Sequence, residues 1–90
     1  MPYINRGLRQ EIDQEINALM RRIEDTAIGS IEPDGMINYA ITRMMHRFFM
    51  GRYTNYERGI GCLECVKLEF YRQSVAVYED DKKAESGDVD

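Results

Sequence analysis

Residues 60–78 read IGCLECVKLEFYRQSVAVY, and apolar side chains occur on nearly every side of the helix that this stretch predicts. One stripe consists of Leu63, Val66, Phe70 and Val77, and a second consists of Cys62, Cys65 and Ala76. A helix that is apolar all round lies either in the centre of a core or between subunits, and ninety residues leave little room for the first arrangement. The stretch therefore predicts a homo-oligomer.

The same stretch is not expected to cross a membrane. Glu64, Lys67, Glu69 and Arg72 lie through its middle, and each charge is costly at membrane depth. No signal peptide is evident either, because the N-terminal residues turn polar without an apolar run. We expect a protein without a membrane partner.

The two cysteines indicate a reducing compartment. Cys62 and Cys65 sit three residues apart inside a helical pattern, which suits packing better than a structural disulfide. We therefore expect a cytoplasmic protein. A redox site of the thioredoxin type would need a preceding strand, and zinc would need two more ligands, whereas the chain offers only His46 besides the cysteines. No cofactor or metal is predicted.

The acidic charge of the chain is concentrated at its C-terminus. The formal net charge is −4, yet residues 1–78 hold ten acidic and ten basic side chains. The excess lies in residues 79–90, where six acidic residues face Lys82 and Lys83. This composition predicts one helical domain over residues 1–79 and a disordered acidic tail over residues 80–90.

The basic part of the molecule lies between Gly35 and Tyr56. No Asp or Glu occurs in this segment, whereas Arg43, Arg47 and Arg52 do. The segment is therefore where we expect attraction for an anion.

Hydrophobic periodicity predicts three helices. The first carries a clean stripe at Leu8, Ile12, Ile16, Leu19 and Ile23, with Asp13 as a candidate N-cap that would leave a separate turn before it. The second spans Met36–Met50, after a turn-rich loop over residues 26–35. Gly51 is expected to end it, and Thr54 or Asn55 to cap the last helix. With no strand pattern, the fold class is all-α: a three-helix bundle, or four helices if the N-terminal turn is separate, that associates into a homo-oligomer.

Helical spacing places a polar stripe on the last helix. Glu64, Lys67, Tyr71, Ser74 and Tyr78 step by three and four residues. The plain interpretation is an i,i+3 pair between Glu64 and Lys67 on a solvated face. The functional interpretation is a small-anion pocket, because arginine and lysine bind phosphate and tyrosine offers a face for a base. The candidate ligand-binding residues are Lys67, Tyr71, Arg72 and Tyr78, joined by Arg43, Arg47 and Tyr39 from the second helix.

Several segments resemble a known family. The stretches GCLECVKLEFYR (61–72), VYEDDKK (77–83) and GDV (87–89), with MPYI (1–4) and NYAITR (38–43), are similar to the hallmark of small uncharacterised proteins of bacteria, archaea and phages. The resemblance implies no established activity. The family pattern has a second arginine where this chain has Gln73 and a proline where it has Val77, so the resemblance does not imply anion binding at position 73.

The function predicted first is non-catalytic binding of a small anionic, nucleotide-like ligand between subunits. Small helical phage oligomers that sequester nucleotide immune signals are similar in size, which suggests a phage anti-defence role. The alternative is an interaction module or inhibitor that docks a host protein through surplus apolar surface. A weak nucleic-acid binder comes third, on the basis of Arg43, Arg47 and Arg52 beside aromatic residues. No set of nucleophile, base and oxyanion donor can be assembled, so no enzyme is predicted.

Overall fold

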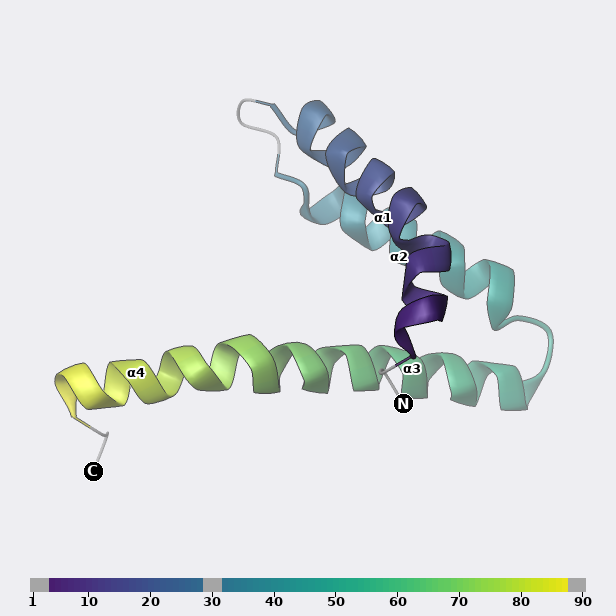
Figure 1. Cartoon of the computed structure of the whole chain (residues 1–90). Helices are drawn as coiled ribbons and strands as arrows, with labels where there is room; N and C mark the ends of the chain where they lie inside the picture. The colour runs from purple at the N-terminus through teal and green to yellow at the C-terminus, as the bar shows by residue number, and fades with distance from the viewer. Residues whose placement is uncertain (1–3, 29–31, 88–90) are drawn as a thin grey trace.

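A computed structural model describes residues 4–28 and 32–87, and these residues are all-α, without a strand. The helices are α1 (Arg6–Thr26), α2 (Asp34–Phe48), α3 (Tyr53–Phe70) and α4 (Ala76–Ser86), with a π-helical segment η1 (Tyr71–Val75) between the last two. Figure 1 shows that α3, η1 and α4 follow one another as a single straight rod, which we call the long helix. In space the described residues thus form three helices, which confirms the predicted all-α class and the number of helices.

α1 is one uninterrupted helix, so of the two arrangements left open, Asp13 is not an N-cap and no separate turn precedes the helix. The cap is Asn5, whose side-chain oxygen accepts a hydrogen bond from the Leu8 backbone N–H at 2.9 Å. This bond satisfies one of the N–H groups that a helix start leaves unpaired, and the apolar stripe then continues unbroken to Ile23.

The corner between α2 and α3 consists of residues 49–52. Gly51 has a φ of +93°, a backbone conformation that favours glycine, and the chain turns there as predicted. Neither Thr54 nor Asn55 caps α3, which begins at Tyr53 without a side-chain cap. Instead, the Asn55 amide donates to the Met50 carbonyl at 2.8 Å and holds the corner closed.

Gly59 brings α3 against the end of α2. It is the one buried residue among those that the structure describes. A Cβ at this position would lie 3.0 Å from the Phe49 Cβ, so only glycine allows this approach without displacement. The Arg58 guanidinium lies 5.6 Å from the centre of the Phe49 ring and covers the same contact.

The long helix widens by one residue at η1. The Ala76 backbone N–H donates to the Tyr71 carbonyl five residues earlier, which is the π pattern in place of the α pattern. The extra residue rotates α4 relative to α3. As a result the Tyr71 hydroxyl donates to Glu79 Oε1 at 2.7 Å across a spacing of eight residues. Nothing in the hydrophobic pattern predicts this shift.

The acidic segment differs from the prediction of disorder from residue 80. α4 continues to Ser86, and Gly87 with a φ of +83° ends it. Within this part of the helix, Lys82 Nζ lies 3.2 Å from Glu85 Oε2 one turn later, an i,i+3 pair that adds to helix stability. Residues 88–90, the rest of the predicted tail, lie outside the described residues.

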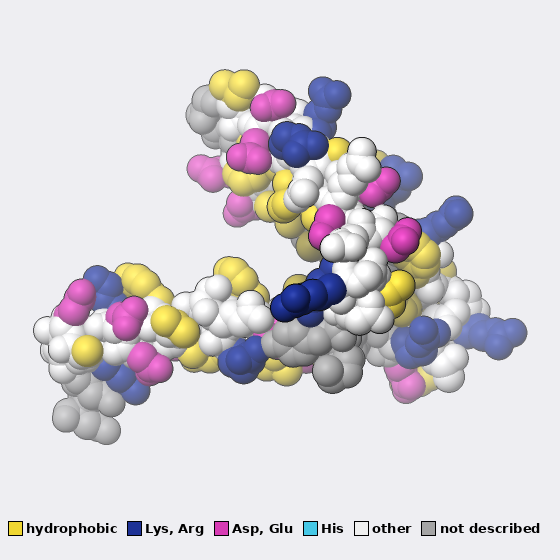
Figure 2. All heavy atoms as spheres, in the orientation of Figure 1, with side chains coloured by type: hydrophobic (Ala, Val, Ile, Leu, Met, Phe, Trp, Pro, Cys, Tyr) yellow, Lys and Arg dark blue, Asp and Glu magenta, His cyan; other side chains and the backbone are white. Residues whose placement is uncertain are grey.

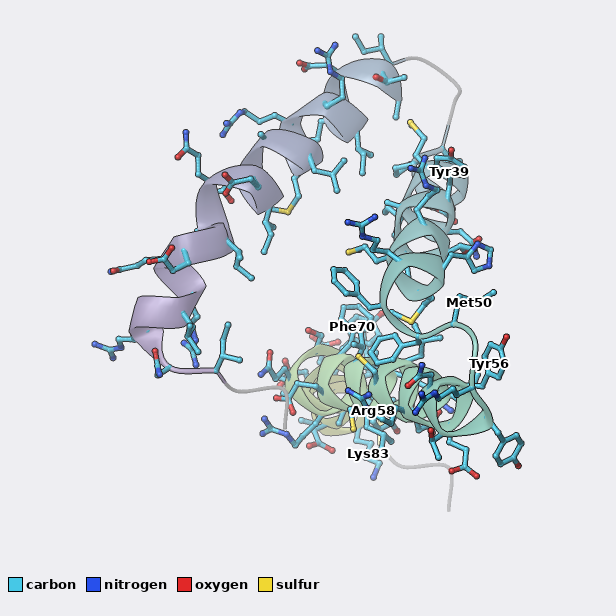
Figure 3. All side chains as sticks on the ribbon, turned by 90° about the vertical axis from the view of Figure 1, so that its right-hand side faces the viewer. Tyr39, Met50, Tyr56, Arg58, Phe70 and Lys83 are labelled. Atoms are coloured by element: carbon cyan, nitrogen blue, oxygen red, sulfur yellow. The ribbon has the colours of Figure 1, made fainter. Side chains whose placement is uncertain are left out.

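The single chain does not form the compact bundle that the sequence predicts. Among the described residues no hydrophobic side chain is buried. The radius of gyration is 16.9 Å, whereas a compact chain of this length has about 12 Å. In Figure 3, α1 and α2 diverge from their connection, with the long helix below them. Figure 2 shows hydrophobic side chains at the surface along the long helix and along the other two helices. The apolar stripes exceed what the other helices of one chain can cover.

Candidate functional site

All the helices of the chain expose large hydrophobic side chains to solvent. The chain exposes 8183 Å², whereas a folded monomer of this mass exposes about 5,400 Å². The surplus is spread over all three helices, with Ile16, Met44 and Phe70 exposed to 43%, 45% and 65%. Surplus of this kind is typical of interaction surfaces.

The two basic residues predicted on α3 and η1 are paired with carboxylates. Lys67 Nζ lies 3.4 Å from Glu64 Oε1, which confirms the plain interpretation of an i,i+3 pair. The Arg72 guanidinium pairs with Glu69 in the same way. These neighbours offset the positive charge that an anionic ligand would meet at Lys67 and Arg72.

Tyr71 and Tyr78 lie together on the C-terminal half of the long helix. The hydrogen bond to the Glu79 carboxylate and the charge of that carboxylate raise the pKa of Tyr71 above its ordinary value. Lys82 Nζ lies 5.5 Å from the centre of the Tyr78 ring. The two tyrosines therefore each contact a charged side chain of α4.

These tyrosines line an open concavity of about 580 Å³. Its charged walls are Glu79, Asp80, Lys82 and Lys83. Sequence reasoning assigned both lysines to a disordered tail and so missed them, although Lys82 follows Tyr78 by one helical turn. Charges of both signs line the concavity, so it holds an anion less favourably than a purely basic surface.

The three residues predicted on α2 form a basic stripe without acidic neighbours in sequence. The Arg43 Nη1 donates to the Tyr39 hydroxyl at 3.0 Å, and its guanidinium lies 5.7 Å from the centre of that ring. Arg47 follows on the same flank one turn later. We call Tyr39, Arg43 and Arg47 the α2 stripe. It spans about 12 Å along the helix.

The two predicted groups do not meet within one chain. Figure 3 shows Tyr39 near the beginning of α2, at the end away from the long helix. Lys67 lies ~21 Å along the long helix from its start at Tyr53. A single pocket containing both groups would require a second chain.

The cysteines are exposed free thiols, so the expected packing of Cys62 and Cys65 does not occur within the single chain. In the part of the chain that the structure describes, no three His, Cys, Asp or Glu side chains lie close enough together to hold a metal ion. Among the same residues, no helix has the length and apolar character to span a membrane.

Comparison with known proteins places the chain in a family without a described activity. Neither the curated proteins nor the solved structures gave a match. The family described as a domain of unknown function (DUF6899) matches residues 1–89, and the chain belongs to that family.

Proposed function

We propose that the protein is a non-catalytic, homo-oligomeric binding protein that holds a small anionic, nucleotide-like ligand in pockets between subunits. The observation that carries the proposal is the surplus of exposed surface, 8183 Å² for a chain of 10.5 kDa. Burial of apolar area is the main driving force of association, and this chain leaves its apolar stripes uncovered. Assembly is the direct way to cover them.

The α2 stripe supports an anionic ligand. Arginine presents a planar fork of donors that matches a phosphate, and a tyrosine ring offers a face on which a base stacks. Arg43 and Arg47 lie in a segment that has no acidic residue from position 35 to 56. Of the predicted ligand residues, Lys67 and Arg72 are paired with glutamates, which offset the positive charge that a ligand would meet there.

A panel of cyclic and linear nucleotides tests the ligand. We expect at least one to raise the melting temperature of the purified protein and to appear in its native mass spectrum. Arg43→Ala and Arg47→Ala should each remove most of that shift. Arg21→Ala is the matched control, because Arg21 lies on α1 opposite its apolar stripe. No shift with any nucleotide would overturn the ligand assignment.

Sequestration of a nucleotide immune signal, as in phage anti-defence, is the role that we propose for such a binder. A stoichiometric binder needs no catalytic residues, and it acts by lowering the free concentration of the signal. Expression of the wild-type chain in cells that carry a nucleotide-signalling defence should restore phage growth. Arg43→Ala should not restore it.

The same exposed apolar faces also favour an interaction module that docks a host protein. The native mass discriminates between the two functions. A chain that stays monomeric and binds no nucleotide, yet captures one host protein in stoichiometric amount, would support the module and contradict the ligand binder.

A further inference from the structure

The helix with the least support from its own chain is α1. It has 21 residues, and its apolar stripe from Leu8 to Ile23 extends over about 22 Å. α2 and α3 approach each other at their corner, whereas α1 has at most a marginal approach to another helix. Most helix stability in proteins comes from packing an apolar face rather than from intrinsic helix propensity. α1 therefore needs a cover.

α2 presents a second apolar stripe beside α1. Ile37, Met44 and Phe48 lie within one sector of its circumference and are exposed to 44%, 45% and 67%. On α1, Ile12, Ile16 and Leu19 are exposed to 48%, 43% and 44%. We call these six residues the α1–α2 face. Ile23, the last residue of the α1 stripe, and Ala27, which follows α1, are half-buried next to the connection, and the helices diverge from there (Figure 3).

We infer that the α1–α2 face is covered by the same face of a second copy of this chain, in a two-fold pair. The inference rests on the proposed homo-oligomer and assigns its contact surface. A two-fold contact uses the same patch on both subunits, so α1 of each copy would pack beside α2 of the other.

The surplus of exposed area is large enough for a contact with a second copy of the chain. The chain exposes roughly 2,700 Å² more than a compact monomer of its mass. Permanent dimers bury about 2,000–5,000 Å² in total, or half of that on each partner. One pairing of this kind therefore accounts for a large part of the surplus.

Charge also favours a second copy. α1 carries five acidic and four basic side chains, whereas α2 carries one acidic and two basic ones. A pair that sets α1 against α2 of the partner brings together helices of opposite net charge. The α2 stripe lies on the flank of α2 outside the apolar sector, so Arg43 and Arg47 would stay at the edge of the contact and remain open to a ligand.

Two charge insertions and a matched control test the contact by native mass spectrometry and light scattering. The wild-type chain should assemble in even numbers. Ile16→Glu and Met44→Glu should each halve the mass at a concentration at which the wild type is fully assembled. Gln14→Glu adds the same charge on the opposite side of α1 and should leave the mass unchanged.

Hydrogen exchange gives a second measurement that does not depend on a variant. Backbone amides of α1 in the wild-type chain should become more slowly exchanging as protein concentration rises. Equal exchange of α1 at all concentrations in an assembled sample would overturn the inference.

Native masses that differ from these expectations would contradict different parts of the inference. Assembled Ile16→Glu and Met44→Glu variants would overturn the α1–α2 contact and leave the proposed oligomer in place. Dissociation by Phe70→Glu without dissociation by Ile16→Glu would place the contact on the long helix and would also overturn the inference. A monomeric wild-type chain would overturn the oligomer itself, together with the pair.

Discussion

At the scale of single residues, Gly59 is the position, among the described glycines, at which an added side chain would meet the nearest neighbour. Its missing side chain lets α3 approach Phe49, and an added Cβ would stand 3.0 Å from one carbon and 3.2 Å from the next. Gly61 lies two residues further along the same helix, and a Cβ there would meet nothing within 4 Å. Substitution of Gly59 therefore tests packing against Phe49, whereas substitution of Gly61 tests helix propensity alone.

Gly59→Ala should lower the free energy of unfolding by about 1–3 kcal/mol, the usual cost of overpacking. Gly61→Ala should raise it by up to about 1 kcal/mol, because alanine is the better helix former. Urea denaturation followed by circular dichroism measures both. Equal effects of the two substitutions would contradict the assigned contact with Phe49.

Tyr71 supplies the second prediction at this scale. Its hydroxyl donates to Glu79, so the hydrogen bond forms while the phenol is protonated, and the pKa of Tyr71 is raised. The contribution of this bond to folding is fully present below the ordinary pKa of tyrosine. It is lost as pH rises through the raised value, because the phenolate then faces a carboxylate.

Glu79→Gln should shift the titration of one tyrosine to lower pH, since the main cause of the raised pKa is removed. Phenolate absorbance in a spectrophotometric titration measures the shift. The shift should be absent when the same change is made in a Tyr71→Phe background. A shift that persists in that background would assign the effect to another tyrosine.

At the scale of helices, α1 depends on a single side-chain cap. Asn5→Ala removes the bond to the Leu8 N–H and should cost about 0.5–2 kcal/mol. Asn17→Ala changes the same residue type inside the helix and should be neutral or slightly stabilising, because alanine has the higher helix propensity. Thermal unfolding of both variants measures the difference. A helix whose main body started near Asp13 would be insensitive to Asn5→Ala.

Local sequence patterns predict some features of the long helix and not others. Its α3 part follows from the apolar residues around Leu63 and Phe70, and its end at Gly87 follows from a residue that tolerates positive φ. The π segment at Tyr71–Val75 has no such signal. It changes the partners of Tyr71, and it aligns Glu79 with a residue that a regular α-helix would place on a neighbouring face.

At the scale of the whole molecule, stability should depend on protein concentration. Among its described residues the single chain buries no apolar side chain, so the proposed assembly would supply its apolar burial. A tenfold rise in concentration should add about 1.4 kcal/mol per dimer. Melting temperatures from calorimetry at several concentrations test this. A melting temperature that stays constant over a hundredfold range would contradict assembly as the source of stability.

Whether the candidate ligand-binding residues lie close together also depends on the arrangement of the whole molecule. The sequence identified the basic character of α2, because the absence of acidic residues between positions 35 and 56 can be counted. It also grouped Lys67 and Tyr71 with Arg43, although these residues lie on different helices that share only one corner. Helical spacing relates residues on one helix, and it carries no information about distances between helices.

By itself, the sequence determined the all-α class, the helical stripe from Leu8 to Ile23, the turn at Gly51 and the excess of apolar residues. Each of these follows from neighbours a few residues apart. Only the tertiary structure decided that α1 diverges from α2, that Phe49 packs on Gly59, and that Tyr71 reaches Glu79 through a π turn. These features depend on how helices compete for the same apolar surface. In a chain this short, that packing leaves much of the apolar surface from Ile60 to Tyr78, like that of α1, exposed.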